Sequence, residues 1–344
     1  YTAVATGAAG ALTATQRDFI DTLTLRLNER TPSSRALAES GRRHLADPRH
    51  IVGFHRDWKG LAYQIAMRAS DGAHVTDIDG NDYVDLTMSL GVAFLGHGHP
   101  AVRKAVHAQL DRGMELGPQA PAAARVAERL CRLTGHERAT FTTTGSEAVM
   151  AALRCARTVT GRHKVVYFTG DYHGTFDGVL GRAHVADDTL STRPVAPGIT
   201  SASVDDVMVL DYDAPDSLAI LQEQADQIAA VLVEPVQSRH PNRQSAAFVK
   251  ELRRITEQAG AALILDEMIT GFRCAPGGLN ALWGVRADMC TYGKILGGGL
   301  PIGAIAGGAR WLDAIDGGSW AFDDDSMPEA TMTFFAGTHV RHPL

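Results

Sequence analysis

Short apolar runs recur along most of the chain, and stretches with helical periodicity separate several of them. The runs lie at residues 139–143, 164–168, 206–210, 229–233, 261–265 and 302–306. Between two of them, Phe248, Leu252 and Ile255 recur at the spacing of one helix face. Such alternation is typical of a mostly parallel sheet that helices cover on both sides. We therefore predict a large α/β domain and assign residues 76–330 to it.

The N-terminal part of the chain has a different pattern. Phe19, Leu23 and Leu27 have the spacing of an amphipathic helix, and residues 74–87 alternate apolar and polar positions around Asp79-Gly80. An Asp-Gly pair within such alternation predicts a β-hairpin. The predicted division is a linker at 1–15, a small N-terminal subdomain at 16–75, the large domain at 76–330 and a C-terminal loop at 331–344.

Composition and charge narrow the class of protein. The chain has 344 residues, of which 45% are apolar and 21% charged, as is ordinary for a globular protein of one large or two smaller domains. The net charge of −6 gives no reason to expect nucleic acid or an anionic membrane as a partner. No apolar run is long enough to span a bilayer and no signal peptide is visible, so we expect a cytoplasmic protein.

Cysteine and histidine spacings give little reason to expect a disulfide framework or a metal site. The four cysteines are far apart and form no C-x-x-C pair, which favours buried free thiols: Cys131, Cys155, Cys274 and Cys290. His97 and His99 flank a glycine, but we identify no nearby carboxylate or thiol to complete a metal site. We expect turn histidines there and no metal.

Charged residues follow three of the predicted strands. Glu234 comes directly after the run 229–233, Asp266 after the run 261–265, and Lys294 after the weaker apolar segment 287–293. Ligands bind outside the carboxyl ends of the strands in open α/β sheets, so the three side chains should meet at one edge. Each of them alone could end a strand simply to reach water, but three at one edge, with a glycine-rich turn after the lysine, favour a site.

Residues 142–157 predict a strand that turns at Gly145 into a helix. Thr144 and Glu147 have the spacing of a capping box. The free N–H groups and the positive dipole end of such a helix suit a phosphate. An ordinary, well-capped turn would show the same pattern.

Tyr172 follows the run 164–168 and brings an aromatic ring to the same edge of the sheet. Such a ring can stack on a planar cofactor, although simple packing is the alternative. A phosphate site, a stacking ring, an acid for a ring nitrogen and a reactive lysine together describe a site for pyridoxal phosphate, with Lys294 as the Schiff-base lysine and Asp266 as the acid.

From about residue 16 onward the sequence resembles the class III (fold type I) aminotransferases. The matching motifs, in chain order, are DIDGNDYVDLT, LGHGHP, TTTGSEA, DYHG, EPVQS, DEMITGFR, TYGKILGGGLPIG and TFFAGTHVRHP. The similarity is greatest to the branch that includes glutamate-1-semialdehyde aminomutase. Within that branch, three segments resemble aminotransferase domains of polyketide and nonribosomal peptide assembly lines: residues 30–54, 234–241 and 314–326. Family members continue beyond the last motif, so the resemblance implies an incomplete C-terminal small domain.

The resemblance implies a role for each residue that contacts the cofactor ring. Lys294 would bind pyridoxal phosphate as a Schiff base and then move a proton, and Asp266 would pair with the ring nitrogen. Tyr172 would stack on one face of the ring, Met268 would cover the other, and His173 would lie close by.

Further residues would hold the phosphate and the substrate. Gly145 and Ser146 would bind the phosphate through their backbone N–H groups, Thr338 would contact the phosphate of a neighbouring subunit, and Glu234 would orient Lys294 or the cofactor oxygen. The segment on the substrate side would comprise Ser89, Leu90 and Gly91.

The resemblance thus implies a transaminase that acts as a homodimer with a shared active site. We expect an amino-acid donor and a carbonyl acceptor, with a β-keto acyl thioester on an acyl carrier protein, or on an adjacent assembly-line domain, as the acceptor. A glutamate-1-semialdehyde-type aminomutase and a free-standing amine transaminase are the enzymatic alternatives. The alternative outside enzymology is a structural or docking unit that has kept the cofactor-binding fold.

Overall fold

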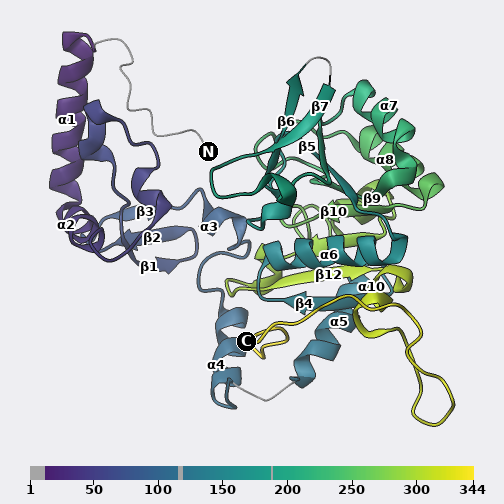
Figure 1. Cartoon of the computed structure of the whole chain (residues 1–344). Helices are drawn as coiled ribbons and strands as arrows, with labels where there is room; N and C mark the ends of the chain where they lie inside the picture. The colour runs from purple at the N-terminus through teal and green to yellow at the C-terminus, as the bar shows by residue number, and fades with distance from the viewer. Residues whose placement is uncertain (1–11, 115–118, 187–188) are drawn as a thin grey trace. The chain divides into compact units, whose positions relative to one another are not determined.

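The structure, a computed structural model, describes residues 12–114, 119–186 and 189–344. The chain divides into two compact units, Tyr1–Arg103 and Lys104–Leu344 (Figure 1). The predicted linker at 1–15 lies almost wholly outside the described residues. The predicted boundaries after residues 15, 75 and 330 stay predictions, because the compact units are divided at a single different point.

The elements have the following bounds. The helices are α1 (Ala14–Arg30), α2 (Pro32–Gly41), α3 (Met88–Gly91), α4 (Pro100–Leu110), α5 (Pro121–Thr134), α6 (Gly145–Thr160), α7 (Pro215–Glu223), α8 (Ala246–Ala259), α9 (Gly278–Trp283) and α10 (Ala309–Asp316). The strands are β1 (Met67–Asp71), β2 (His74–Asp77), β3 (Asp82–Val84), β4 (Arg138–Thr142), β5 (Lys164–Phe168), β6 (Gly181–Ala186), β7 (Thr189–Pro194), β8 (Val207–Leu210), β9 (Ile228–Val233), β10 (Ala262–Asp266), β11 (Met289–Tyr292) and β12 (Gly303–Gly307). The 3₁₀ helices are η1 (Pro48–Ile51), η2 (Arg56–Leu61), η3 (Asp177–Val179), η4 (Ser201–Ser203), η5 (Ala225–Gln227) and η6 (Lys294–Gly297).

The first unit contains a three-stranded antiparallel sheet in the order β1-β2-β3. The predicted hairpin is confirmed as the pair β2 and β3. The buried carboxylate of Asp77 shapes its turn, because Oδ1 accepts hydrogen bonds from the N–H groups of Asp79 at 3.0 Å and Asn81 at 2.8 Å. The alternation in the sequence did not indicate the third strand, β1, whose residues are all exposed.

The predicted N-terminal helix is present as α1, and a capping box between Thr13 and Gln16 starts it. Its apolar stripe is not covered, because the exposed fractions of Phe19 and Leu23 are 66% and 41%. None of the helices in the described part of the chain is long and apolar enough to cross a membrane.

The second unit is built on a seven-stranded sheet in the order β4-β12-β11-β10-β9-β5-β8. The strands β8, β5, β9, β10 and β11 run parallel, whereas β12 is antiparallel to both of its neighbours. The six predicted runs are all strands of this sheet, and the weaker segment at 287–293 contains β11. The prediction of a mostly parallel α/β sheet is confirmed.

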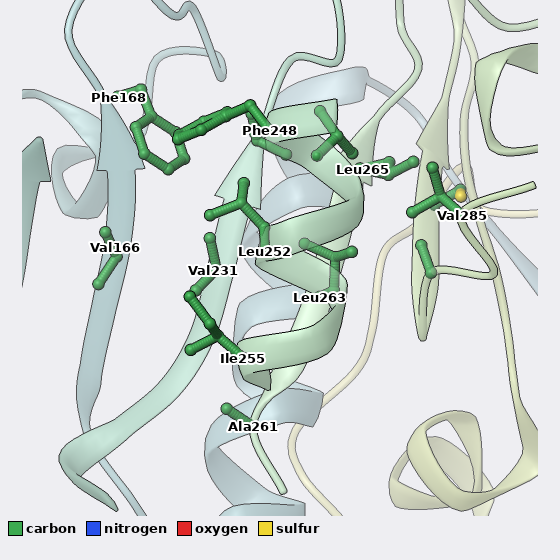
Figure 2. Close-up of a cluster of buried hydrophobic side chains, with 14 of the residues drawn as sticks. Val166, Phe168, Val231, Phe248, Leu252, Ile255, Ala261, Leu263, Leu265 and Val285 are labelled. Atoms are coloured by element: carbon green, nitrogen blue, oxygen red, sulfur yellow. The ribbon is translucent and has the colours of Figure 1, made fainter. Parts of the chain in front are cut away.

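Both faces of this sheet are buried. Helix α8 packs on one face, where Phe248, Leu252 and Ile255 lie against side chains of β9 and β10 (Figure 2). Helices α6 and α10 pack on the other face, where the alternate side chains of the same strands point, such as Leu232 and Ile264. Fully burying a side chain of this kind stabilises the fold by about 1.5–3 kcal/mol. The two cores therefore hold the strands firmly, and with them the loops that leave the strand ends.

Two expectations drawn from histidine and cysteine spacing need correction. His97 does have a carboxylate partner, because its Nε2 lies 2.8 Å from Oδ2 of Asp85, twelve residues earlier. The turn brings the two residues together, which linear spacing did not reveal. All four cysteines are free thiols, and Cys155 and Cys290 are buried as expected, but Cys131 is only half-buried and Cys274 is exposed. Among the described residues, no group of three potential ligands could hold a metal ion.

Candidate active site

Loops at one edge of the seven-stranded sheet surround a cavity of about 190 Å³. They leave the carboxyl ends of β5, β9, β10 and β11, and the start of α6 completes the wall. The cavity is lined by Gly145, Ser146, Val149, Tyr172, His173, Gly174, Glu234, Ser238, Asp266, Met268, Ile269 and Lys294. The structure thus brings together every predicted site residue between positions 145 and 294, although their roles stay predictions.

The remaining predicted residues do not line this cavity. Thr338 is exposed in a segment without regular secondary structure, and its predicted contact would be with another subunit. Ser89, Leu90 and Gly91 belong to the first compact unit. Their backbone is left-handed, with φ values of 54°, 60° and 82°.

Lys294 enters the cavity from the junction between β11 and η6. Its own backbone is left-handed, with φ at 43°, a conformation that residues with a side chain rarely adopt. Gly293, the residue before Lys294, packs closely against Met268. A Cβ atom at Gly293 would lie 2.7 Å from Sδ of Met268, so only glycine fits there without displacing Met268.

Asp266 ends β10 with a side chain that is only 1% exposed. Its Oδ1 accepts hydrogen bonds from the N–H group of Met268 at 3.1 Å and the hydroxyl of Thr291 at 3.2 Å. Its Oδ2 lies 2.8 Å from Nδ1 of His173. The carboxylate is therefore held on both oxygens, and a buried carboxylate so held favours a positively charged partner.

His173 lies between two carboxylates. Besides the contact with Asp266, its Nε2 lies 3.3 Å from Oδ2 of Asp171. Burial alone would lower the pKa of His173, but the two carboxylates outweigh burial and raise that pKa to about 10. The imidazole is therefore positively charged at neutral pH.

Glu234 follows β9 and is 4% exposed. Its Oε2 accepts hydrogen bonds from the N–H group of Tyr172 at 3.0 Å and from the hydroxyl of Ser238 at 3.3 Å. Burial raises the pKa of Glu234 to about 7, with help from the charges of Asp171 and Asp266. This carboxyl group can therefore take up or release a proton near neutral pH.

The start of α6 is suited to an anion. The predicted capping box is present: Oγ1 of Thr144 accepts from the N–H group of Glu147 at 3.2 Å, and Oε2 of Glu147 accepts from that of Thr144 at 2.9 Å. The first N–H groups of a helix have no partner within the helix. Those of Gly145 and Ser146 are left for a ligand at the positive end of the helix dipole.

The walls of the cavity fit a planar, phosphorylated cofactor. Tyr172 is 49% exposed, so its ring is available for stacking. A Cβ atom at Gly145 would lie 2.7 Å from Sδ of Met268, so a larger residue at the start of α6 would have to displace the end of that side chain. An amine, a buried carboxylate, an aromatic face and a helix N-terminus are the groups that pyridoxal phosphate needs.

The prediction from sequence missed residues that lie just behind the cavity wall. Asp171 contacts His173, Thr291 donates to Asp266, and Gln237 donates to Asp171 at 2.7 Å. All three belong to motifs already noted, namely DYHG, TYGK and EPVQS. Their membership of these motifs, in or shortly after strands of the large sheet, was the available signal.

Residues 58–336 match the family described as Aminotransferase class-III. The chain belongs to the class III aminotransferases. The resemblance that the motifs indicated is thereby confirmed, and so is the fold type I architecture of this family.

Several class III aminotransferases are similar to this chain. The glutamate-1-semialdehyde 2,1-aminomutase of Chloroflexus aggregans is 40% identical over 246 residues, which make up 71% of this chain and 56% of that protein. A solved transaminase with PLP bound has a TM-score of 0.78 and 29% identity, and the match covers 91% of this chain and 71% of the other. A β-phenylalanine aminotransferase from Variovorax paradoxus has a TM-score of 0.74 and 30% identity, and the match covers 89% of this chain and 68% of the other.

The cofactor of this class III aminotransferase chain is pyridoxal phosphate. The curated relatives it matches are longer proteins, of which the matched part spans between 56 and 59%.

Proposed function

We propose that the chain forms the cofactor-binding part of an enzyme that transfers an amino group from an amino-acid donor to a carbonyl compound. The observation that carries this proposal is the cavity of about 190 Å³ that Lys294, Asp266, Tyr172 and the start of α6 line together. A scaffold kept only for docking would have no need for a lysine in a strained backbone conformation at this place.

Each side chain of the cavity has a part in this proposal. When bound, pyridoxal phosphate withdraws electrons from the carbon that carries the amino group, so that a proton can leave that carbon. Lys294 would bind the cofactor covalently in the absence of substrate. Once the amine of the donor has taken its place, the freed Nζ amine would carry this proton. Asp266 keeps the ring nitrogen protonated, because an ionised carboxylate favours a positive partner. Tyr172 and Met268 hold the two faces of the ring.

The phosphate contacts extend the proposal to two subunits. The N–H groups of Gly145 and Ser146 hold the phosphate in the same subunit, and Thr338 supplies a further contact in the partner subunit. A homodimer with a shared active site follows, and closed two-fold dimers are the commonest oligomers.

The proposed acceptor is a β-keto acyl thioester on an acyl carrier protein. The likeness of residues 30–54 and 234–241 to assembly-line domains supports it. The similarity to a β-phenylalanine aminotransferase supports chemistry at the β-carbon of an acid. Ser89, Leu90 and Gly91 would line the substrate side. Delivery by a tethered carrier raises the local substrate concentration, so the pocket need not bind the free acid tightly.

Mass spectrometry of the carrier protein tests this acceptor. We expect the mass of the β-keto acyl carrier to change by ketone-to-amine exchange when enzyme, cofactor and amino donor are present. The Lys294→Ala variant should leave the carrier mass unchanged under the same conditions. A donor screen with each candidate amino acid in turn then identifies the donor.

An aminomutase is the second candidate, because the curated relative from Chloroflexus aggregans bears that name at 40% identity. With glutamate-1-semialdehyde as the only substrate, our proposal expects no 5-aminolevulinate. Efficient conversion of the semialdehyde beside an unchanged carrier would make the aminomutase the better answer. Transfer to free aldehydes or ketones, with the carrier again unchanged, would favour a free-standing amine transaminase.

A further inference from the structure

Asp171 is a buried carboxylate that none of the roles above requires. It follows β5 in the motif DYHG, and its side chain has no exposed surface. Its Oδ1 accepts a hydrogen bond from Nε2 of Gln237 at 2.7 Å, and its Oδ2 accepts one from the N–H group of Glu234 at 3.2 Å. A buried carboxylate is costly unless it is paired, so its partners indicate what it does.

Gln237 fixes the orientation of Asp171. Its side chain is fully buried, and its Nε2 also donates to the carbonyl of Thr169 at 2.8 Å. Both neighbours are acceptors, which requires the NH₂ group of the amide to face them. Gly170 packs against this amide, because a Cβ atom there would lie 3.2 Å from Nε2 of Gln237. The carboxylate of Asp171 therefore has little freedom to turn away from its partners.

Asp171, His173 and Asp266 form a buried row of charges. Oδ2 of Asp171 lies 3.3 Å from Nε2 of His173, and Nδ1 of His173 lies 2.8 Å from Oδ2 of Asp266. The side chains of His173 and Asp266 are each 1% exposed. A neutral imidazole would present a lone pair to one of the two carboxylates, which is repulsive between buried side chains. Two protons on the ring give each carboxylate a positive partner.

The groups around His173 come from several elements. Asp171 and Asp266 face it from the ends of β5 and β10, and Glu234, after β9, acts on it at longer range. The ring of Tyr167 in β5 packs edge-on against the imidazole of His173, with the two ring centroids 5.8 Å apart. Lys294 lines the same cavity. The two groups in close contact with His173 are both carboxylates, so the charges around the ring favour a positively charged imidazole.

We propose that Asp171 is a positioning residue that keeps His173 doubly protonated, so that Nδ1 of His173 donates to Oδ2 of Asp266 and holds that carboxylate in the cavity wall. Asp171 does not line the cavity and acts on the cofactor only through His173. The step from Asp266 to the cofactor ring rests on the proposed function, whereas the charge state of His173 does not.

Nitrogen NMR of isotope-labelled histidine in the cofactor-free protein measures this charge state directly. The difference between the wild-type and His173→Gln spectra identifies the His173 signals. We expect both ring nitrogens to carry protons at about pH 8, where an unperturbed histidine is neutral. A single protonated nitrogen at that pH would overturn the proposal, and this measurement needs no substitution at Asp171.

Asp171→Asn removes the charge and keeps the shape. We expect the pH at which His173 loses its second proton to fall by at least about one unit, the effect of removing a nearby opposite charge. Asp211→Asn is the matched control, because Asp211 follows the neighbouring strand β8 and is exposed. An unchanged His173 titration in a folded Asp171→Asn protein would overturn the proposal.

The pH profile of the bound-cofactor absorbance provides a second measurement. In Asp171→Asn we expect the cofactor to stay bound and the pH midpoint of its absorbance change to differ from that of the wild type. If Asp171 served only for packing, this midpoint would stay in place, and that result would overturn this step. If the wild type bound no cofactor while His173 was doubly protonated, the proposed function would fail and the role of Asp171 toward His173 would stand.

Discussion

The same two short segments contribute to two cavities, which differ in what lines them. Residues 142–146 and 294–297 contribute to both. The larger cavity, of about 420 Å³, has an apolar wall on the sheet side formed by Phe141, Leu296 and Ile302. The smaller one, of about 190 Å³, encloses buried carboxylates and a lysine. The larger cavity is also lined by His339, Arg341 and His342, but no acidic side chain and no lysine are among its described lining residues. The smaller cavity combines an acid that can pair with a ring nitrogen and a lysine that can form a Schiff base.

One substitution in each cavity tests this comparison most directly. Lys294→Ala should lower amino-group transfer by at least about 10²–10⁴-fold, since the proton transfer by the lysine amine alone contributes that much. Val126→Ala, in the wall of the larger cavity, should leave the rate unchanged. Borohydride reduction and peptide mapping should place the reduced cofactor on Lys294. Cofactor on any other lysine would refute the assignment.

Asp266→Asn should retain the cofactor and slow transfer by about 10- to 100-fold. A hydrogen bond to a charged group is worth about 1.5–3 kcal/mol, and the variant loses the charge that keeps the ring nitrogen protonated. Single-turnover kinetics with and without deuterium on the donor carbon that loses its proton measure the affected step. Near-normal rates would show that another group holds the ring nitrogen.

The last expected effect is on stability and not on rate: a pH-dependent loss of stability that originates in Glu234. Its pKa in the folded chain, about 7, lies above the ordinary value of 4.5, so the fold favours the protonated carboxyl. The stability from this group is fully present below pH 4.5 and is lost as the pH rises through 7, by up to about 3 kcal/mol. Thermal unfolding of the cofactor-free protein should show this loss, and Glu234→Gln should reduce it. The exposed Glu257→Gln serves as control, and equal pH slopes in both variants would contradict the assignment.

Much of the fold and of the cavity could be predicted from local pattern. Apolar runs identified the strands of the large sheet because buried parallel strands are apolar on both faces. Asp266 and Lys294 could be placed at one edge because residues that follow parallel strands share that edge. The capping box at Thr144 could be located from spacing alone.

Other features depend on strand order, which periodicity does not specify. His173 and Asp266 follow β5 and β10, and β9 lies between these strands in the sheet, so their contact could not be anticipated from the sequence. The run that forms β12 gave no sign that it is antiparallel to its neighbours. The spacing of Phe19 and Leu23 likewise predicted a helix without indicating that its apolar face would be exposed.

At Lys294 the backbone conformation favours glycine, whereas the proposed chemistry requires a side chain with an amine. Glycine adopts a φ of 43° freely, whereas any other residue there is strained by an energy on the order of 1 kcal/mol. A sequence chosen only for the stability of this turn would therefore have glycine at position 294. The chain instead has its amine-bearing side chain there, and the two packed cores beneath the turn keep the strained conformation in place.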